Sequence, residues 1–191
     1  EDQVWPKRCG HMPGKTVIPA EEMVQKIKAA TDARRDSGFV IKARTDAAAP
    51  LGVDEAIRRL NLYGEAGADI LLADALVTRA DIEKVAKNVS KPVAVSMGLA
   101  IRARKTTPPV PPGDLQAMGI AQVTYPRLFT AAALKGMQNA LAVFQQEVVE
   151  GNRIVDRPDL MASFDEINDL MGLPVLEDGL PAKREYRKFK V

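Results

Sequence analysis

FVIKARTDAAAPLGVDEAIRRLNLYGEAGADILLADA, residues 39–75, is the stretch that decides the fold of this chain. It begins with a short apolar run at 39–47, continues with an amphipathic stretch at 52–68, and returns to an apolar run at 69–75. Short runs rich in β-branched residues predict strands, and longer amphipathic stretches predict helices. The stretch therefore predicts a strand–helix–strand unit, whose two strands lie parallel in one sheet.

The same alternation continues on both sides of this stretch. Strands are expected to begin near Phe39, Asp69, Pro92 and Ala121, roughly 23 to 30 residues apart. This is the spacing of β-α-β units, so we expect a parallel sheet whose strands are neighbours in sequence order. Antiparallel pairing among them would contradict this interpretation. Helices are expected over 21–34, 52–68, 78–90, 112–119 and 130–152.

Two α/β architectures are built from such units, and the sequence favours one of them. The doubly wound fold usually carries a G-x-G-x-x-G phosphate loop after a strand, and this sequence has none. A (β/α)8 barrel of the TIM type is therefore preferred. A complete barrel needs about 250 residues, so residues 1–152 are expected to form only its carboxyl-terminal half, strands 4 to 8. Residues 153–191 are expected to form a carboxyl-terminal helical extension.

Capping and apolar spacing predict how the last two helices begin. Thr130 is expected to cap the helix over 130–152. In the extension, a separate helix is expected to begin after Pro158. The apolar face of that helix is expected to consist of Leu160, Met161, Phe164, Ile167 and Leu170.

The composition excludes several classes of protein. Hydrophobic residues make up 46% of the chain and charged residues 27%, as in globular proteins. The net charge of +2 argues against a nucleic-acid or membrane partner. A single cysteine cannot form an internal disulfide, which favours a reducing, cytoplasmic compartment. No apolar run approaches the ~18 residues of a spanning helix, and no signal-peptide pattern is present.

Polar residues end each of the four expected strands. Barrel enzymes keep their chemistry at the carboxyl-terminal ends of the strands. Any one such residue is as easily a solvated loop residue, but four strands that end alike favour a shared polar rim. The residues concerned are Arg44 and Asp46, then Asp74, then Ser96, then Tyr125 and Arg127.

The motif EDQVWPKRCGHMPGK, residues 1–15, holds the only cysteine and the only histidine, Cys9 and His11. A Cys-x-His pair offers too few ligands for a structural zinc site, which takes four. Gly10 and Gly14 give this segment the character of a loop that can move. From the residues alone, an incidental cysteine beside a surface histidine is an equally good interpretation.

Together with ARTDA (43–47), this motif resembles the isocitrate lyase and phosphoenolpyruvate mutase superfamily. The resemblance is closest to the methylisocitrate-lyase-like and alkylmalate-lyase-like members. The K-[KR]-C-G-H loop following E-D-Q is highly specific. Further matches lie at EAGAD (65–69), TTP (106–108) and SFDEIN (163–168), so the resemblance covers nearly the whole chain.

The resemblance implies a carbon–carbon lyase that acts on a small 2-hydroxy dicarboxylate or tricarboxylate through an enolate, with Mg²⁺, or alternatively Mn²⁺, as cofactor. It places the motif in the gating loop after the fourth barrel strand. Cys9 is then the general acid/base that protonates the enolate, while Lys7 and His11 tune it and order the loop. Glu1 falls at an acidic strand end that contacts the metal through water.

The resemblance also implies a set of substrate-binding residues. Arg44 matches the arginine that clamps the substrate carboxylate, a task suited to a two-pronged guanidinium. Thr107 belongs to a loop whose hydroxyls help to bind a carboxylate. Asp74 stands where typical lyases have Glu, and Ser96 stands where they have Asn. The direct metal aspartates of the family lie on earlier strands, which this sequence does not contain.

These departures leave two alternatives to the lyase. One is a carboxyphosphonoenolpyruvate-type phosphonomutase of the same superfamily. Cys9 favours the lyase, because phosphonate-forming relatives commonly lack Cys in this loop, whereas Asp74 and Ser96 do not decide. The other is a catalytically incomplete barrel fragment. Family members exchange carboxyl-terminal helices between subunits, so the resemblance also implies a homo-oligomer.

Overall fold

The computed structural model describes residues 1–103 and 106–172 of the chain. Much of the expected extension, residues 173–191, therefore lies outside the described residues. The helices and strands follow in chain order as α1 (Ala20–Ala33), β1 (Lys42–Thr45), α2 (Ala48–Leu51), α3 (Val53–Glu65), β2 (Ile70–Ala73), α4 (Arg79–Asn88), β3 (Val93–Ser96), α5 (Pro112–Ala117), β4 (Ile120–Thr124), α6 (Leu128–Val143), the π-helix η1 (Phe144–Glu150) and α7 (Phe164–Met171).

The chain divides into two compact units, Glu1–Ala131 and Ala132–Val191. The first unit contains all four strands of the sheet that the described residues form. The boundary falls within α6, about 20 residues before the predicted division at residue 152, which stays a prediction.

The sheet confirms the predicted α/β class and strand order. All four strands are parallel, and they lie in the order β1-β2-β3-β4. The first strand begins at Lys42, three residues later than the apolar run suggested. The backbone N–H of Phe39 instead donates to the carbonyl of Asp36 in a turn, and the Phe39 side chain is 66% exposed. An apolar run thus predicted the strand but not its first residue.

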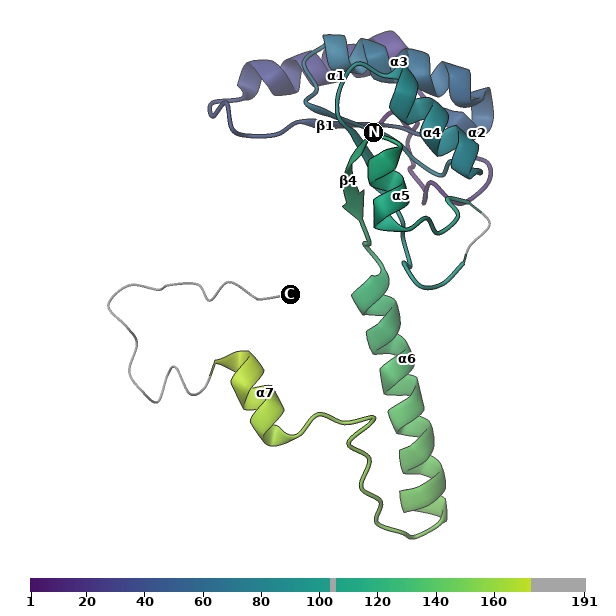
Figure 1. Cartoon of the computed structure of the whole chain (residues 1–191), viewed down its shortest axis with the longest axis vertical. Coiled ribbons are helices and arrows are strands. Elements are labelled where there is room, and N and C mark those ends of the chain that lie inside the picture. Colours follow the sequence, from purple (N-terminus) through teal and green to yellow (C-terminus); the bar gives the residue numbers. More distant parts are fainter. Residues whose placement is uncertain (104–105, 173–191) are drawn as a thin grey trace, which may run out of the picture. The chain divides into compact units, whose positions relative to one another are not determined.

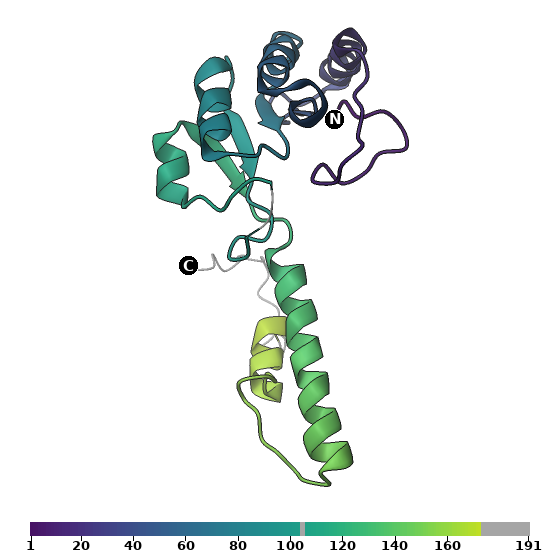
Figure 2. The ribbon, with the colours of Figure 1, turned by 90° about the vertical axis from the view of Figure 1, so that its right-hand side faces the viewer.

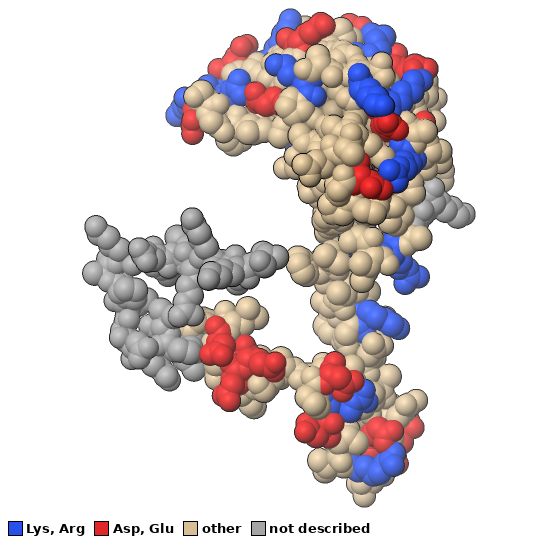
Figure 3. Space-filling view, viewed as in Figure 1, with Lys and Arg blue, Asp and Glu red and all other residues tan. Residues whose placement is uncertain are grey.

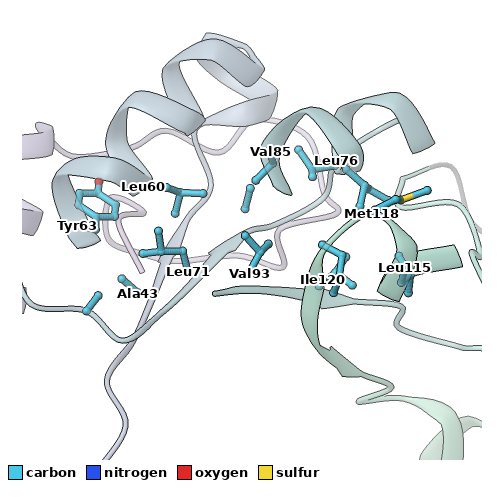
Figure 4. Close-up of a cluster of buried hydrophobic side chains, with 14 of the residues drawn as sticks. Ala43, Leu60, Tyr63, Leu71, Leu76, Val85, Val93, Leu115, Met118 and Ile120 are labelled. Atoms are coloured by element: carbon cyan, nitrogen blue, oxygen red, sulfur yellow. The ribbon is translucent and has the colours of Figure 1, made fainter. Parts of the chain in front are cut away.

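The hydrophobic core lies between the sheet and the helices that cover one of its faces (Figures 1 and 2). The strand side chains that point toward the helices in Figure 4 are Ala43, Leu71, Val93 and Ile120. They meet side chains of α3, α4 and α5, namely Leu60, Tyr63, Val85 and Leu115. Because side chains alternate along a strand, Arg44, Leu72 and Ser96 lie on the opposite face of the sheet. The irregularity in the pairing of β3 with β4 brings Thr124, the partner of Ser96, to that face as well.

The start of α6 corrects one prediction. The helix begins at Leu128, so Thr130 lies inside its first turn and is not the cap. The hydroxyl of Thr130 donates to the carbonyl of Arg127 at 3.4 Å. The chain enters the helix directly from the turn in which the Leu128 N–H donates to the Tyr125 carbonyl. The last part of the expected helix is the π-helix η1.

The start of α7 corrects a second prediction. This helix begins at Phe164, because Ser163 and Glu166 form a reciprocal capping box. Leu160 and Met161 precede the helix in a turn and therefore do not belong to its apolar face. The predicted face keeps Phe164, Ile167 and Leu170, all of them exposed.

No helix within residues 1–103 and 106–172 is long and apolar enough to cross a membrane. On the face of the first unit that Figure 3 shows, basic and acidic side chains are intermixed. This pattern agrees with the small net charge of the sequence.

Candidate active site

A cavity of about 590 Å³ opens at the carboxyl ends of the strands, on the face of the sheet that no helix covers in the first unit. Three parts of the chain contribute to its wall: the amino-terminal loop, the strand ends, and the turn that leads into α6. The lining residues are Glu1, Arg8, Cys9, Gly10, His11, Arg44, Leu72, Asp74, Ser96, Gly98, Thr124, Pro126, Arg127 and Thr130.

Asp2 attaches the amino-terminal segment to the first strand and to α3. Its side chain is fully buried, and its Oδ1 accepts a hydrogen bond from the backbone N–H of Asp46 at 2.8 Å. Its Oδ2 accepts from Thr45 Oγ1 at 2.7 Å and Tyr63 Oη at 2.8 Å. Arg59 Nη1 supplies the neutralising charge at 3.2 Å. Burial and the neighbouring Asp2 charge raise the pKa of Tyr63, so its hydroxyl stays a donor.

Replacing Asp2 with asparagine is expected to lower the free energy of unfolding by about 2 kcal/mol, since an amide nitrogen must then face a buried donor. Asp54→Asn is the matched control, because Asp54 is exposed and pairs with the exposed Lys84. That control should shift the stability by no more than about 0.5 kcal/mol. Urea unfolding measures both variants. Equal midpoints for Asp2→Asn and Asp54→Asn would show that Asp2 does not anchor the segment.

Arg44 gathers three carboxylates at the edge of the cavity. Its Nε donates to Asp46 Oδ2 at 2.8 Å and lies 3.3 Å from Glu1 Oε2. Its Nη2 donates to Asp46 Oδ1 at 2.9 Å and lies 2.7 Å from Asp74 Oδ2. Within the described part of the chain, Nη1 has no partner. One guanidinium edge therefore holds the acidic cluster, and one nitrogen is left for a ligand anion.

The charges of this cluster depend on each other. Burial disfavours the charged Arg44, but the hydrogen bond to Asp46 and the charges of Asp74 and Glu1 outweigh burial and raise the pKa of Arg44. Burial likewise opposes ionisation of Asp46, yet hydrogen bonds from Arg44 and Lys15 lower its pKa below the usual range. Both groups are therefore charged at neutral pH.

The loop that carries Cys9 and His11 sits directly on this cluster at Gly10. A Cβ atom at position 10 would overlap Asp74 Oδ2 and would lie 2.7 Å from Asp46 Oδ1. Only a residue without a side chain can approach the two carboxylates this closely. The glycine between the cysteine and the histidine is thus required by a contact, and the free, exposed thiol of Cys9 lines the cavity.

Six of the eight residues predicted for the site line the same cavity: Glu1, Cys9, His11, Arg44, Asp74 and Ser96. Lys7 lies outside the lining and pairs with Glu1 at 3.6 Å. Thr107 is buried outside the lining, and its backbone N–H donates to the Leu76 carbonyl.

His11 meets the residue before Thr107. Its Nδ1 lies 2.6 Å from Thr106 Oγ1, so a hydroxyl of the TTP segment contacts the loop histidine. The roles in catalysis and binding that the sequence analysis gave to all eight residues stay predictions.

The structure adds residues that the motif reading did not single out. The side chain of Gln3 bridges the backbone of Arg8 in both directions, accepting from its N–H at 3.1 Å and donating to its carbonyl at 2.9 Å. Arg127 was expected in the polar rim and lines the cavity together with Thr130. Gln3 lies within the E-D-Q motif, so the motif itself was the available signal.

The described residues do not by themselves provide a Mg²⁺ site. They contain no group of three or more His, Cys, Asp or Glu residues that could hold a metal ion. Mg²⁺ prefers near-octahedral oxygen coordination, usually through one or two carboxylates and several waters. Glu1 is the half-buried carboxylate on the wall that could contact a metal through water. Asp46 and Asp74 are occupied by Arg44.

The sequence matches a known family over most of its length. The family model described as phosphoenolpyruvate phosphomutase matches residues 1–144. 2,3-Dimethylmalate lyase of Eubacterium barkeri is 35% identical over 178 residues, which are 93% of this chain and 59% of that protein. Carboxyvinyl-carboxyphosphonate phosphorylmutase of Arabidopsis thaliana is 38% identical, over 91% of this chain and 50% of that protein. 2-Methylisocitrate lyase of Salmonella typhimurium is 34% identical, over 98% of this chain and 61% of that protein.

Solved structures agree with the sequence matches. The crystal structure of a 2,3-dimethylmalate lyase, a member of the PEP mutase/isocitrate lyase superfamily, has a TM-score of 0.78 at 25% identity, with 93% of this chain and 56% of that chain covered. Phosphonopyruvate hydrolase in complex with oxalate and Mg²⁺ has a TM-score of 0.73 at 28% identity, with 93% and 59% covered. This chain thus spans between half and about three fifths of the length of these five proteins.

Proposed function

Since this chain belongs to the phosphoenolpyruvate phosphomutase family, we propose that it supplies the carboxyl-terminal half of a (β/α)8-barrel enzyme that cleaves a carbon–carbon bond. The proposed substrate is a small 2-hydroxy dicarboxylate or tricarboxylate of the methylisocitrate or alkylmalate type. The observation that carries this proposal is one cavity that holds the Cys9–His11 loop and the Arg44 cluster together, at the carboxyl ends of parallel strands.

In the proposed reaction, the substrate hydroxyl transfers its proton to a carboxylate of the cavity wall and becomes a carbonyl, while the bond between that carbon and its neighbour breaks. The electron pair remains on the neighbouring carbon as an enolate, and the thiol of Cys9 protonates that carbon. Arg44 holds a carboxylate of the substrate through Nη1, whose hydrogens have no other acceptor in the described residues. Among the described residues, Glu1 and Asp74 are the carboxylates on the cavity wall, and one of them is proposed to take the proton of the hydroxyl and to return it through water to the Cys9 thiolate.

Mg²⁺ is part of this proposal, with Mn²⁺ as the alternative ion. Support comes from the family and from the phosphonopyruvate hydrolase structure whose name includes Mg²⁺. When bound, such an ion supplies positive charge for the developing enolate. Its direct ligands would come from strands that precede this chain, and Glu1 would contact it through water.

Half a barrel explains why one face of the sheet lacks a partner. Parallel sheets are normally covered on both faces, whereas here helices cover one face in the first unit. Within the described residues, β1 and β4 each pair on one side only. The missing strands would close the barrel across these two edges.

A homo-oligomer with exchanged carboxyl-terminal helices also belongs to the proposal. On α7 the side chains of Phe164 and Leu170 are 85% and 78% exposed. An apolar helix face of this kind normally packs against another surface. The proposed partners are a small carboxylate and a second copy of the chain, without nucleic acid or membrane, and the proposed compartment is the cytoplasm, which rests on the single cysteine.

A substrate panel tests the reaction class on the complete protein that contains this chain. Wild-type enzyme with Mg²⁺ is incubated with 2-methylisocitrate, 2,3-dimethylmalate and carboxyphosphonoenolpyruvate. We expect a 2-oxo acid from one of the two 2-hydroxy acids, and no phosphorus–carbon bond formation by ³¹P NMR. Rearrangement of the phosphonate precursor without cleavage of either 2-hydroxy acid would establish the phosphonomutase. If none of the three compounds reacts, the result would favour a catalytically incomplete barrel.

A further inference from the structure

Lys15 connects the loop that carries Cys9 and His11 to Asp46, one of the carboxylates that Arg44 binds. Its Nζ donates to the carbonyl of Gly10 and, at 3.1 Å, to Asp46 Oδ1. The side chains of Lys15 and Asp46 are 2% and 0% exposed. Lys15 does not line the cavity, so it does not touch a ligand there.

The carbonyl that accepts from Lys15 belongs to Gly10, which lies between Cys9 and His11, so its position affects both of these residues. A group that fixes this carbonyl fixes the peptide planes from which both side chains project. The same residue packs its Cα against the Asp74 and Asp46 carboxylates. The loop is thus held at one residue from two sides.

Lys15 is the second cation beside Asp46, whose first partner, Arg44, is shared with Asp74 and Glu1. Asp46 already receives two hydrogen bonds from Arg44, at 2.8 and 2.9 Å. Removing a lysine ammonium from water costs several kcal/mol unless its donors are satisfied. Here Asp46 and the loop carbonyl accept from two of the three N–H donors, so the arrangement stabilises the lysine and the loop position together.

We propose that Lys15 is a positioning residue, which holds the Gly10 carbonyl against Asp46 and thereby sets the Cys9 thiol and the His11 ring at the mouth of the cavity. This inference rests on the proposed function for its catalytic meaning. Its structural content is independent of that function: the buried Lys15–Asp46 pair holds the loop at Gly10, in addition to the contacts of Gln3 with Arg8 and of His11 with Thr106.

Hydrogen–deuterium exchange on the whole chain tests the structural content. In Lys15→Met, the amides of residues 8–14 are expected to exchange about tenfold faster or more, while those of α3 and α4 keep their wild-type rates. Lys26→Met is the matched control, because Lys26 is an exposed lysine that pairs with Glu22. It should leave the loop rates unchanged.

A second variant covers the case in which Lys15→Met does not fold. Lys15→Gln keeps a polar group beside Asp46, but its shorter amide cannot reach Asp46 and the Gly10 carbonyl together, so the loop should again exchange faster. Loop rates within about threefold of wild type in either folded variant would overturn the proposal. Equal acceleration of the loop, α3 and α4 would also overturn it, since the lysine would then only stabilise the fold.

Kinetics on the complete enzyme test the catalytic meaning. Lys15→Met is expected to lower kcat about tenfold or more with KM within about threefold, because the loop is displaced and the cavity wall is not. A raised KM with unchanged kcat would overturn the positioning role. The exchange experiment needs no substrate, so a wild-type enzyme without lyase turnover would remove the proposed function and leave the loop result standing.

Discussion

Replacing Arg44 with lysine in the complete enzyme is expected to lower kcat/KM by roughly 10²-fold or more. Lysine keeps the positive charge but offers a single ammonium in place of a planar guanidinium. It therefore cannot hold the acidic cluster and a substrate carboxylate at once. A factor of 10² corresponds to about 2.7 kcal/mol of lost transition-state stabilisation.

The geometry of Arg44 is the reason for so large an effect. Its Nε and Nη2 together bridge Asp46, and Nη2 also reaches Asp74 at 2.7 Å. An ammonium at this position can satisfy part of this set, which leaves a buried carboxylate without its partner. Asp46 also accepts a hydrogen bond from Lys15, which in turn holds the carbonyl of Gly10. A displaced Asp46 would therefore also displace the loop at Gly10.

The control for this variant is Arg58→Lys. Arg58 forms a two-pronged pair with Glu55 on the exposed face of α3, outside the cavity. It should leave kcat/KM within about twofold, because an exposed ion pair contributes little. Steady-state kinetics on both variants, with circular dichroism to confirm folding, make the comparison. Unchanged kcat/KM for Arg44→Lys would remove Arg44 from the site.

The sheet could be predicted from the sequence because its signal is local and repeated. Each strand is a short apolar run that follows an amphipathic helix, and parallel order follows from the spacing of those runs. The core side chains Leu71 and Val93 lie within the runs that predicted them. Phe39 shows the limit of that signal, because this apolar residue at the edge of the run lies in a turn and not in the strand.

The contacts that build the site could not be predicted in this way. Lys15 lies only five residues from Gly10, yet its buried partner Asp46 lies 31 residues away. In the sequence, Lys15 stands in a polar loop, and a lysine in such a loop is expected to be exposed to solvent. The contact between His11 and Thr106 likewise joins residues far apart in the sequence and depends on the path of the loop.

The start of α7 is a different case, because the sequence did contain its signal. Ser163 and Glu166 have the S-x-x-E spacing of a capping box. The prediction gave more weight to Pro158, which also precedes helices. The reciprocal hydrogen bonds between Ser163 and Glu166 show which of the two signals determines the first residue of the helix.

The largest effect is expected from the strands that we propose complete the barrel. Residues 1–191 alone should neither bind Mg²⁺ tightly nor cleave 2-methylisocitrate. Among the described residues of the cavity wall, Glu1 is the acidic residue that Arg44 does not hold by a hydrogen bond or by a pair shorter than 3 Å. One such carboxylate is a poor anchor for an ion that needs direct oxygen ligands. The unpaired edges of β1 and β4 also invite association in place of a closed barrel.

A segment of about 100 residues that precedes Glu1 and ends in a strand should restore both properties, since a complete barrel needs about 250 residues. Such a segment would supply the strands that close the sheet and the carboxylates that hold the metal. Replacing Glu1 with glutamine in the longer protein should then lower the affinity for Mg²⁺ less than removal of the segment does, because Glu1 is proposed to contact the ion through water.

The most direct test is a calorimetric Mg²⁺ titration combined with a lyase assay, on residues 1–191 and on the protein extended by the preceding segment. The account predicts no tight Mg²⁺ binding and no cleavage for residues 1–191, and metal-dependent formation of a 2-oxo acid for the extended protein. Robust metal-dependent cleavage by residues 1–191 alone would contradict it, because the catalytic carboxylates would then lie within this chain and the role of Glu1 would be misassigned.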